Sequence, residues 1–378
     1  MRVAIIGWAQ VGHKERIVDR SPSELVLEVV NKALEHACVE HKDVDFVVQS
    51  SDDIVDGRSI SNVWTTESSG AFLKEESKVE EDGAFAAIYA LSKILSGFAR
   101  IAVVVAYGKI SESSLQEYSS SICEPFYLRP LGVEMFTLGA LQCSLFLKKN
   151  FLKEEDLAYI VVKSRRNGVQ NQFATLKRPI TLDEVLESEY VFRPLRETMI
   201  PTAADGAAAI VMASEDVALR SPSKVWIEGV GFSQGHYYPG YQDISRITSM
   251  RKAAQQAYKT SAIKNPKREI DFIEISEIFP HVELMALEEL GIGTAKRLAK
   301  FVREGAFAKN GRFPINPSGG LLCSYIVMAA GLIRMIEVAR RLSGEVQDIE
   351  REVKRALAHG CSGNLHQSNV IWVLARDK

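Results

Sequence analysis

An internal repeat constrains the fold of this chain more than any other feature of its sequence. Residues 2–8 (RVAIIGW) form a β-rich run that ends near a glycine, and residues 224–231 (KVWIEGVG) echo it. Each run is followed by an irregular stretch and then by an amphipathic helical pattern. The next apolar runs also match, at 45–49 (DFVVQ) and 271–275 (DFIEI). The repeat therefore predicts two β-α-β-α-β units in one chain.

The ends of a third pair of helices support the same division. KILSG at 93–97 matches RRLSG at 340–344, and we expect an apolar strand after each, at 101–106 and 369–374. Short apolar strands that alternate with amphipathic helices favour an α/β fold. We expect an N-terminal half at 1–220, which includes an inserted loop domain at about 111–197, and a C-terminal half at 221–378.

Composition and charge exclude several classes of protein. Lys and Arg number 46 against 48 Asp and Glu, so the net charge of −2 argues against a nucleic-acid binder. No run of about 18 apolar residues predicts a membrane span, and the first residues do not resemble a signal peptide. Five dispersed cysteines without a CxxC spacing predict free thiols and no metal site. We therefore expect a cytoplasmic protein.

Several motifs occur in an order known from one family. RRN at 165–167, AADGAAA at 203–209, SEIF at 276–279 and NPSGGL at 316–321 resemble segments of the thiolase superfamily, most of all archaeal and sterol-carrier-type thiolases. The resemblance implies a thiolase fold, with duplicated halves forming a layered α-β-α-β-α core. It also implies an acyl-CoA substrate, coenzyme A as part of that substrate with no covalently bound cofactor, and a homodimer. A small OB-fold or zinc-ribbon protein is the further partner that the resemblance suggests.

The nucleophilic cysteine of that family has no counterpart in this chain. The segment that resembles the nucleophile loop reads VEEDGAFAA at 79–87, which puts Gly83 or its neighbour Asp82 at the cysteine position. No cysteine lies between Cys38 and Cys123. Neither glycine nor aspartate can form the thioester intermediate of a thiolase, so two-step acyl transfer is not expected.

A tyrosine stands where the family carries its activating histidine. Tyr325 follows GGLLCS at 319–324, and thiolases have a G-H-P motif there. The exchange resembles thiolase-like aldolases of steroid side-chain degradation, which lack the cysteine and carry G-G-L-L-S-E-x-Y; here Cys323 and Ser324 replace Ser-Glu. A phenol can act as acid or base. The alternative is a structural tyrosine at the start of a buried helix.

The resemblance implies further site residues. The segment HGCSG contains His359, Cys361 and Gly363 and lies where thiolases carry C-x-G or H-N-x-G-G. His281 is a further candidate, as a substitute for the Asn or His that the family carries at the position of Ser276. His366 is a further polar candidate, although a lone histidine is more often structural. Oxyanion or substrate contacts are expected from Ser276, Glu277, Gly363, Asn316 and Gly320, and coenzyme contacts from Arg165, Arg166 and Ser318.

Three functions remain open on this basis. The first is an enzyme that makes or breaks a C–C bond in an acyl-CoA without a cysteine nucleophile, by aldol or retro-aldol chemistry on a β-hydroxyacyl-CoA, with Tyr325 as acid/base. The second is a non-catalytic thiolase-fold scaffold subunit of an acyl-CoA enzyme complex. The third is an acetyl-CoA acetyltransferase-like acyltransferase.

Overall fold

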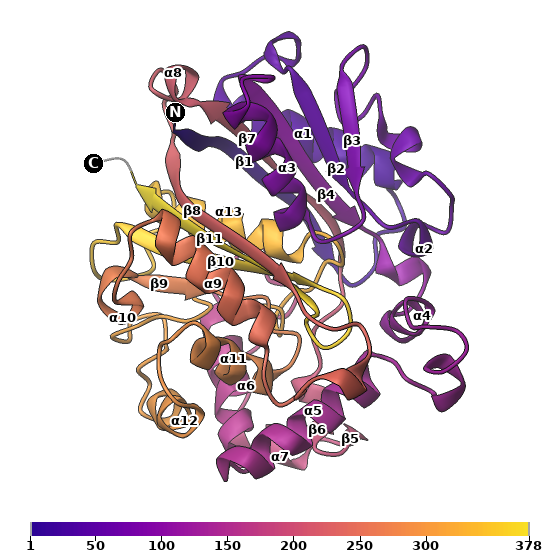
Figure 1. Cartoon of the computed structure of the whole chain (residues 1–378), viewed down its shortest axis with the longest axis vertical. Helices are drawn as coiled ribbons and strands as arrows, with labels where there is room; N and C mark the ends of the chain where they lie inside the picture. Colours follow the sequence, from indigo (N-terminus) through magenta and orange to yellow (C-terminus); the bar gives the residue numbers. More distant parts are fainter. Residues whose placement is uncertain (1, 377–378) are drawn as a thin grey trace.

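Two related half-sheets form the framework of the molecule. The computed structural model describes residues 2–376 and contains a nine-stranded mixed sheet in the order β3-β2-β4-β7-β1-β8-β11-β10-β9 (Figure 1). The first five of these strands belong to one half and the last four to the other. Their bounds are β1 Val3–Lys14, β2 Phe46–Ser50, β3 Glu75–Val79, β4 Ile101–Gly108, β7 Asp205–Ser214, β8 Val225–Gln234, β9 Phe272–Glu274, β10 Arg355–Ser362 and β11 Ser368–Arg376.

The strand order confirms the predicted duplication. In the first half β2 runs parallel to β4, and β7 pairs antiparallel with both β4 and β1. In the second half β9 runs parallel to β10, and β11 pairs antiparallel with both β10 and β8. Among the described residues, the two half-sheets join edge to edge where β1 pairs with β8, at Ala4 with Trp226 and Ile5 with Val225. Strand β3 is an addition of the first half.

One predicted strand assignment is corrected by the structure. The helix that ends with RRLSG is followed by β10, and the predicted strand at 369–374 is part of the next strand, β11. Residues 355–362 read RALAHGCS, and this mixture of charged, small and histidine residues hides a buried strand from a search for apolar runs. The correction matters because β10 carries Cys361.

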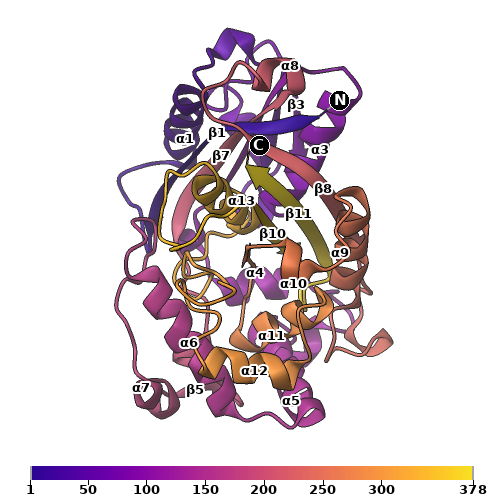
Figure 2. The ribbon, with the colours of Figure 1, turned by 90° about the vertical axis from the view of Figure 1, so that its left-hand side faces the viewer.

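Helices form the other layers. Helix α1 (Pro22–Ala37) covers the outer face of the first half-sheet, and α9 (Thr248–Thr260) covers that of the second (Figure 2). Helices α3 (Gly83–Leu95) and α13 (Ala330–Leu342) share one apolar core with residues of both half-sheets, so they form the central layer. The core is thus layered α-β-α-β-α, as expected.

The N-terminus of α1 shows how local sequence sets these elements. Ser21 accepts a hydrogen bond from the Glu24 N–H, the Glu24 side chain binds the Ser21 N–H in return, and Pro22 occupies the first turn. This is a capping box with proline at a position where no N–H is needed.

The segment between β4 and β7 supplies a wall of the candidate site. It contains α4 (Leu115–Ser121), α5 (Met135–Asn150), α6 (Glu154–Gly168), α7 (Leu182–Glu187) and the hairpin of β5 (Tyr190–Phe192) and β6 (Leu195–Arg196). Its apolar side chains share a core with α11 (Pro280–Glu289) and α12 (Ala295–Arg303) of the second half. The remaining short helices are α2 (Asp53–Asp56), α8 (Glu215–Ala218) and α10 (Pro266–Glu269).

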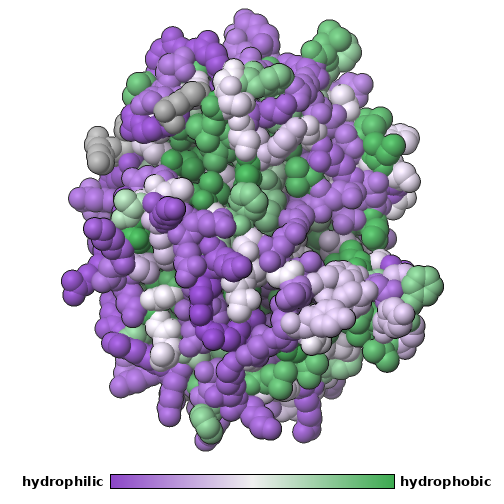
Figure 3. All heavy atoms as spheres, in the orientation of Figure 1, coloured by the Kyte–Doolittle hydropathy of each residue, from purple (hydrophilic) through white to green (hydrophobic). Residues whose placement is uncertain are grey.

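The surface carries apolar groups among many charged ones. Apolar side chains gather over α3 and β8 on the face shown in Figure 3, and the exposed large apolar residues of these two elements are Tyr89, Leu95 and Phe232. Within residues 2–376, no helix has the length and apolar character that a membrane crossing requires.

Candidate active site

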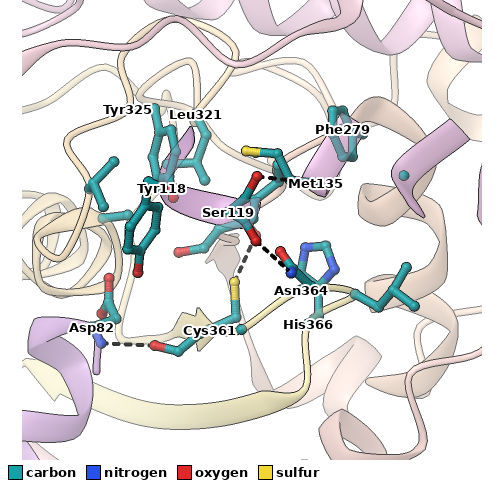
Figure 4. A pocket seen from close by; sticks show the side chains of 18 of the residues that line it. Asp82, Tyr118, Ser119, Met135, Phe279, Leu321, Tyr325, Cys361, Asn364 and His366 are labelled. Atoms are coloured by element: carbon teal, nitrogen blue, oxygen red, sulfur yellow. Dashed lines mark hydrogen bonds between the residues drawn. The ribbon is translucent and has the colours of Figure 1, made fainter. Parts of the chain in front are cut away.

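A pocket lies where the central helices begin and strand β10 ends. The space inside it, together with open solvent at its mouth, is about 730 Å³. Apolar side chains such as Met135, Phe279 and Leu321 line much of it. Figure 4 shows the polar side chains among them; the pocket's polar members are Asp82, Tyr118, Ser119, Gln142, Ser276, Tyr325, Cys361, Ser362, Asn364 and His366.

The start of α3 has no room for a nucleophilic side chain. A Cβ atom added to Gly83 would lie 2.7 Å from the Cβ of Ala106 and 2.9 Å from the Cβ of Leu332. The carboxylate of Asp82 occupies the helix end instead: Oδ1 accepts from the Ala84 N–H at 2.8 Å, and Oδ2 accepts from the Gly331 N–H at 2.7 Å. A carboxylate cap satisfies N–H groups that a helix leaves free.

Introducing a cysteine at this point should therefore harm the protein without restoring a thiolase. We expect Gly83→Cys to lower the free energy of unfolding by about 1–3 kcal/mol, the usual cost of overpacking, and to form no acyl-enzyme. Thermal unfolding and intact-mass spectrometry after incubation with acetyl-CoA measure the two effects. Gly240→Cys is the control, because a Cβ added there would have no atom of residues 2–376 within 4 Å beyond Gly240 itself and its two chain neighbours. A stable, acylated Gly83→Cys protein would contradict the steric argument.

Three ionisable groups act on one another in the pocket. Burial raises the pKa of Asp82 to about 7, with a smaller contribution from the charge of Glu81. Burial, with the charges of Cys361 and Asp82, raises the pKa of Tyr325. Burial also raises the pKa of the Cys361 thiol well above its ordinary value, and the Asp82 charge adds to this. Near neutral pH the pocket thus holds a protonated phenol, a protonated thiol and a carboxyl group in mid-titration.

The backbone fixes the position of Tyr325. Its N–H donates to the Thr202 carbonyl at 2.7 Å, and its carbonyl accepts from the Ala204 N–H at 2.9 Å. Three residues later Met328 has φ 68°, in the left-handed region, and its carbonyl accepts from the Gly83 N–H at 2.7 Å. Such a conformation is costly for a residue with a side chain and is typical of functional sites. Tyr325 precedes α13 by five residues and lines the pocket.

The structure separates the other candidates into those that line the pocket and those behind it. Cys361, Gly363 and Ser276 line it, although the Ser276 hydroxyl donates to the His359 carbonyl at 2.7 Å. His359 is buried behind this wall, with its Nε2 3.0 Å from Asn369 Oδ1.

His281 also lies behind the wall. Its Nε2 is 3.1 Å from Oε1 of Gln142, which itself lines the pocket. The geometry makes His281 a neighbour that orients Gln142, and His281 does not line the pocket.

A further set of predicted residues braces the loop before Tyr325. Asn316 Oδ1 accepts from the Ile275 N–H at 2.6 Å, and Glu277 Oε1 accepts from the Leu321 N–H at 2.9 Å. Gly320 has φ 68°, and a Cβ on it would lie 1.9 Å from Glu277 Oε1, so only glycine fits. None of Asn316, Glu277 and Gly320 lines the pocket.

The residues predicted to contact the coenzyme do not line the pocket. Ser318 is buried and its hydroxyl donates to Glu274 at 2.7 Å, which leaves it no surface for a ligand. Arg165 on α6 is buried too, whereas Arg166 is exposed. Neither arginine lines the pocket, and their coenzyme role stays a prediction.

Two pocket residues carried no signal in the sequence. Tyr118 comes from α4, and its hydroxyl lies 3.4 Å from Asp52 Oδ2, an interaction that joins residues 66 positions apart. Burial and the Asp52 charge raise the pKa of Tyr118 well above its ordinary value. Gln142 on α5 is likewise visible only once the inserted segment is folded against α11.

Glu277 gives a stability prediction. Burial, with the charge of Glu283, raises its pKa from 4.5 to about 8. Between about pH 4.5 and pH 8, Glu277 is therefore protonated in the folded protein and ionised in the unfolded chain. The free energy of unfolding falls as the pH rises through this range, because the folded state binds more protons than the unfolded state. Glu277→Gln, which keeps the site neutral, should unfold at a higher temperature than the parent protein at pH 8, with a smaller difference at pH 5. Thermal unfolding at both pH values measures this.

The exposed Glu67 provides a matched control. Glu67→Gln should leave the unfolding temperature unchanged at both pH values. An equal effect of Glu277→Gln at pH 5 and pH 8 would show that proton binding at Glu277 does not contribute to the pH dependence.

The fold has two duplicated half-sheets about two central helices. Its pocket lies at the start of α3 and the end of β10. Together these features define a thiolase-like α/β protein. Residues 233–376 match the family described as "Thiolase C-terminal domain-like". Over nearly its whole length the chain is similar to proteins of the thiolase superfamily.

Individual relatives refine this placement. The chain is 26% identical over 380 residues to an acetyl-CoA acetyltransferase of Methanocaldococcus jannaschii, covering 96% of this chain and 95% of that one. It is 27% identical over 243 residues to benzoylsuccinyl-CoA thiolase subunit BbsB of Thauera aromatica, covering 63% of each chain. In fold it is similar to a solved Ltp2-ChsH2(DUF35) aldolase, with a TM-score of 0.82, 23% identity, and coverage of 100% of this chain and 98% of that one.

Proposed function

We propose that this protein makes or breaks a C–C bond in an acyl-CoA by aldol chemistry, without a cysteine nucleophile. The observation that carries the proposal is the exchange at the start of α3: Gly83 has no room for a nucleophile, and the neighbouring Asp82 shares the pocket with Tyr325. An aldol step needs a base and an acid but no acyl-enzyme. The fold similarity to a protein named as an aldolase agrees with this chemistry.

In the proposed cleavage, Asp82 acts as the base and Tyr325 as the acid. The Asp82 carboxylate accepts the proton of the substrate β-hydroxyl, and the Cα–Cβ bond breaks as the β-carbon becomes a carbonyl. The electron pair of that bond passes to the thioester as an enolate, and the Tyr325 phenol donates a proton to the α-carbon. Return of the proton from Asp82 to Tyr325 closes the cycle. The products are a carbonyl compound and a shortened acyl-CoA.

The lining of the pocket agrees with a largely apolar acyl group. Ile122, Met135, Phe279, Leu321 and Val327 supply apolar surface around the polar groups. Coenzyme A enters this proposal as part of the substrate.

A second candidate function is a non-catalytic subunit that works with a partner. An adjoining pocket, which shares Asn364 and Tyr118 with the first, is lined by the acidic residues Asp52, Glu80 and Glu81. Among the described residues, neither pocket is lined by a Lys or Arg. An acidic mouth is unfavourable for the phosphates of coenzyme A, so a partner that brings basic groups would complete the site. A homodimer, or a complex with a small OB-fold or zinc-ribbon protein, is the form we propose for it.

Acyl transfer like that of an acetyltransferase is the third candidate, and the site supports it least. The pocket cysteine, Cys361, lies near the end of a strand and has a raised thiol pKa. A reactive thiolate needs a lowered pKa, as at a helix N-terminus.

Product-resolved mass spectrometry separates the three candidates. The purified protein is incubated with a β-hydroxyacyl-CoA alone, and separately with a β-ketoacyl-CoA plus free coenzyme A. An aldehyde or ketone together with a shortened acyl-CoA from the first mixture supports the aldolase. Thiolytic products from the second mixture would contradict it and favour acyl transfer. No turnover of either mixture would favour the non-catalytic subunit.

A further inference from the structure

His366 is a buried polar side chain without an internal partner. Its ring lines the pocket among the side chains of Figure 4, and the residue is 3% exposed. Neither Nδ1 nor Nε2 has a hydrogen-bond partner among residues 2–376. Buried polar groups in folded proteins are nearly always paired, and an unpaired one costs about 1–3 kcal/mol. An unpaired buried group calls for a specific explanation, and for His366, which lines a pocket, that explanation is a ligand that supplies the missing partner.

The loop that carries His366 is held in a costly conformation. Between β10 and β11, Leu365 and His366 have φ 60° and 57°, in the left-handed region. Asn364 ties this loop to the inserted segment, because its Nδ2 donates to the Ser119 carbonyl at 3.1 Å and to Cys123 Sγ at 2.9 Å. The His366 carbonyl accepts from Asn369 Nδ2 at 2.7 Å. The surroundings therefore impose this backbone at a residue whose side chain lines the pocket.

The imidazole presents hydrogen-bonding capacity without charge. Burial lowers the pKa of His366 to about 3, with a smaller contribution from His359. A neutral imidazole has one N–H donor and one nitrogen acceptor. A hydroxyl can hydrogen-bond to either ring nitrogen, whereas a carbonyl oxygen can accept only from the N–H. A carboxylate is disfavoured, because the imidazole stays neutral and offers it no positive charge.

We propose that His366 hydrogen-bonds a hydroxyl group of the substrate acyl chain and so makes the pocket selective for hydroxylated acyl groups. This inference rests on the proposed function for the acyl-CoA class of substrate. It concerns recognition, and it assigns His366 no part in proton transfer. A site built to pair with a hydroxyl rejects the analogue without it, because a buried polar group is then left unpaired.

Equilibrium binding of two unreactive probes tests the inference. They are thioether analogues of a β-hydroxyacyl-CoA and of its deoxy counterpart, in which CH₂ replaces the thioester carbonyl so that no enolate can form. Calorimetry should show that the parent protein binds the hydroxylated probe about tenfold more tightly, roughly the contribution of one well-placed hydrogen bond. His366→Phe should bind both probes alike, and His366→Gln, which keeps a donor and an acceptor, should restore most of the preference.

His41→Phe is the matched control, since His41 binds Asn31 at the exposed surface. It should keep the full preference. Equal binding of the two probes to the parent protein would overturn the inference without any variant. A preference that survives in His366→Phe would overturn it as well, and so would a His366→Gln protein that folds but shows no preference.

The outcome is independent of turnover. If the product assay finds no aldol cleavage but the tenfold preference depends on His366, the proposed function fails and the recognition role stands. If cleavage is found and the preference is absent, the recognition role fails alone.

Discussion

Replacing Tyr325 by phenylalanine is expected to lower kcat for cleavage of a β-hydroxyacyl-CoA by roughly a hundredfold to ten-thousandfold, the range for a lost acid or base. The change removes one oxygen that faces the pocket. Within residues 2–376 that hydroxyl makes no hydrogen bond, so the fold and the unfolding temperature should be preserved. Steady-state rates of carbonyl release, with KM determined separately, measure the effect.

Tyr89→Phe is the control for Tyr325→Phe. Tyr89 lies partly exposed on α3, outside the pocket, and should tolerate loss of its hydroxyl without a change in rate. A Tyr325→Phe enzyme with nearly normal kcat would remove the phenol from the mechanism, and the proton donor would have to be sought elsewhere in the pocket, with Cys361 the first to test.

Asp82→Asn is expected to have a comparable effect on the rate, together with a change in its pH dependence. Because the pKa of Asp82 is raised to about 7, the carboxylate is the minor form below that pH. In the parent enzyme kcat/KM should therefore increase up to tenfold for each pH unit below about 7 and level off above it. Asp82→Asn should lower kcat/KM and should abolish its increase with pH below about 7, which is the acid limb of the profile. The measurement is a pH profile of kcat/KM from pH 5 to pH 9.

Glu81 offers a control that moves the profile without removing the base. Its negative charge contributes to the raised pKa of Asp82, so Glu81→Gln should shift the acid limb to lower pH while the plateau rate is largely kept. An acid limb near pH 7 that persists in Asp82→Asn would assign the titration to another group and would exclude Asp82 as the base.

Local patterns made the framework predictable. Short stretches of sequence contain the helix spacing, the Ser21 cap and the apolar strands at the start of each half. These stretches adopt the secondary structure that their sequences predict. Strand β10 was not predicted, because its own residues are mixed in character and its buried position depends on pairing with β9 and β11 and on packing against α13.

The site was predictable only where a single position decides the chemistry. The missing cysteine near Gly83 and the tyrosine at 325 can be read directly from the sequence. The hydrogen bond from the Gly331 N–H to Asp82 joins residues 249 positions apart. The ring nitrogens of His366 are unpaired because no hydrogen-bonding group of residues 2–376 lies within reach of them. Such facts follow from tertiary packing, which no local pattern encodes.

The position of Asp82 has a consequence for how this fold can hold a buried anionic group. The Asp82 carboxylate accepts one hydrogen bond from an N–H in the first turn of α3 and a second from an N–H in the first turn of α13. The positive ends of two helix dipoles, one from each half, therefore converge on a single point. Duplication itself creates this electropositive focus from backbone alone, so the place that holds a buried anionic group is part of the duplicated scaffold.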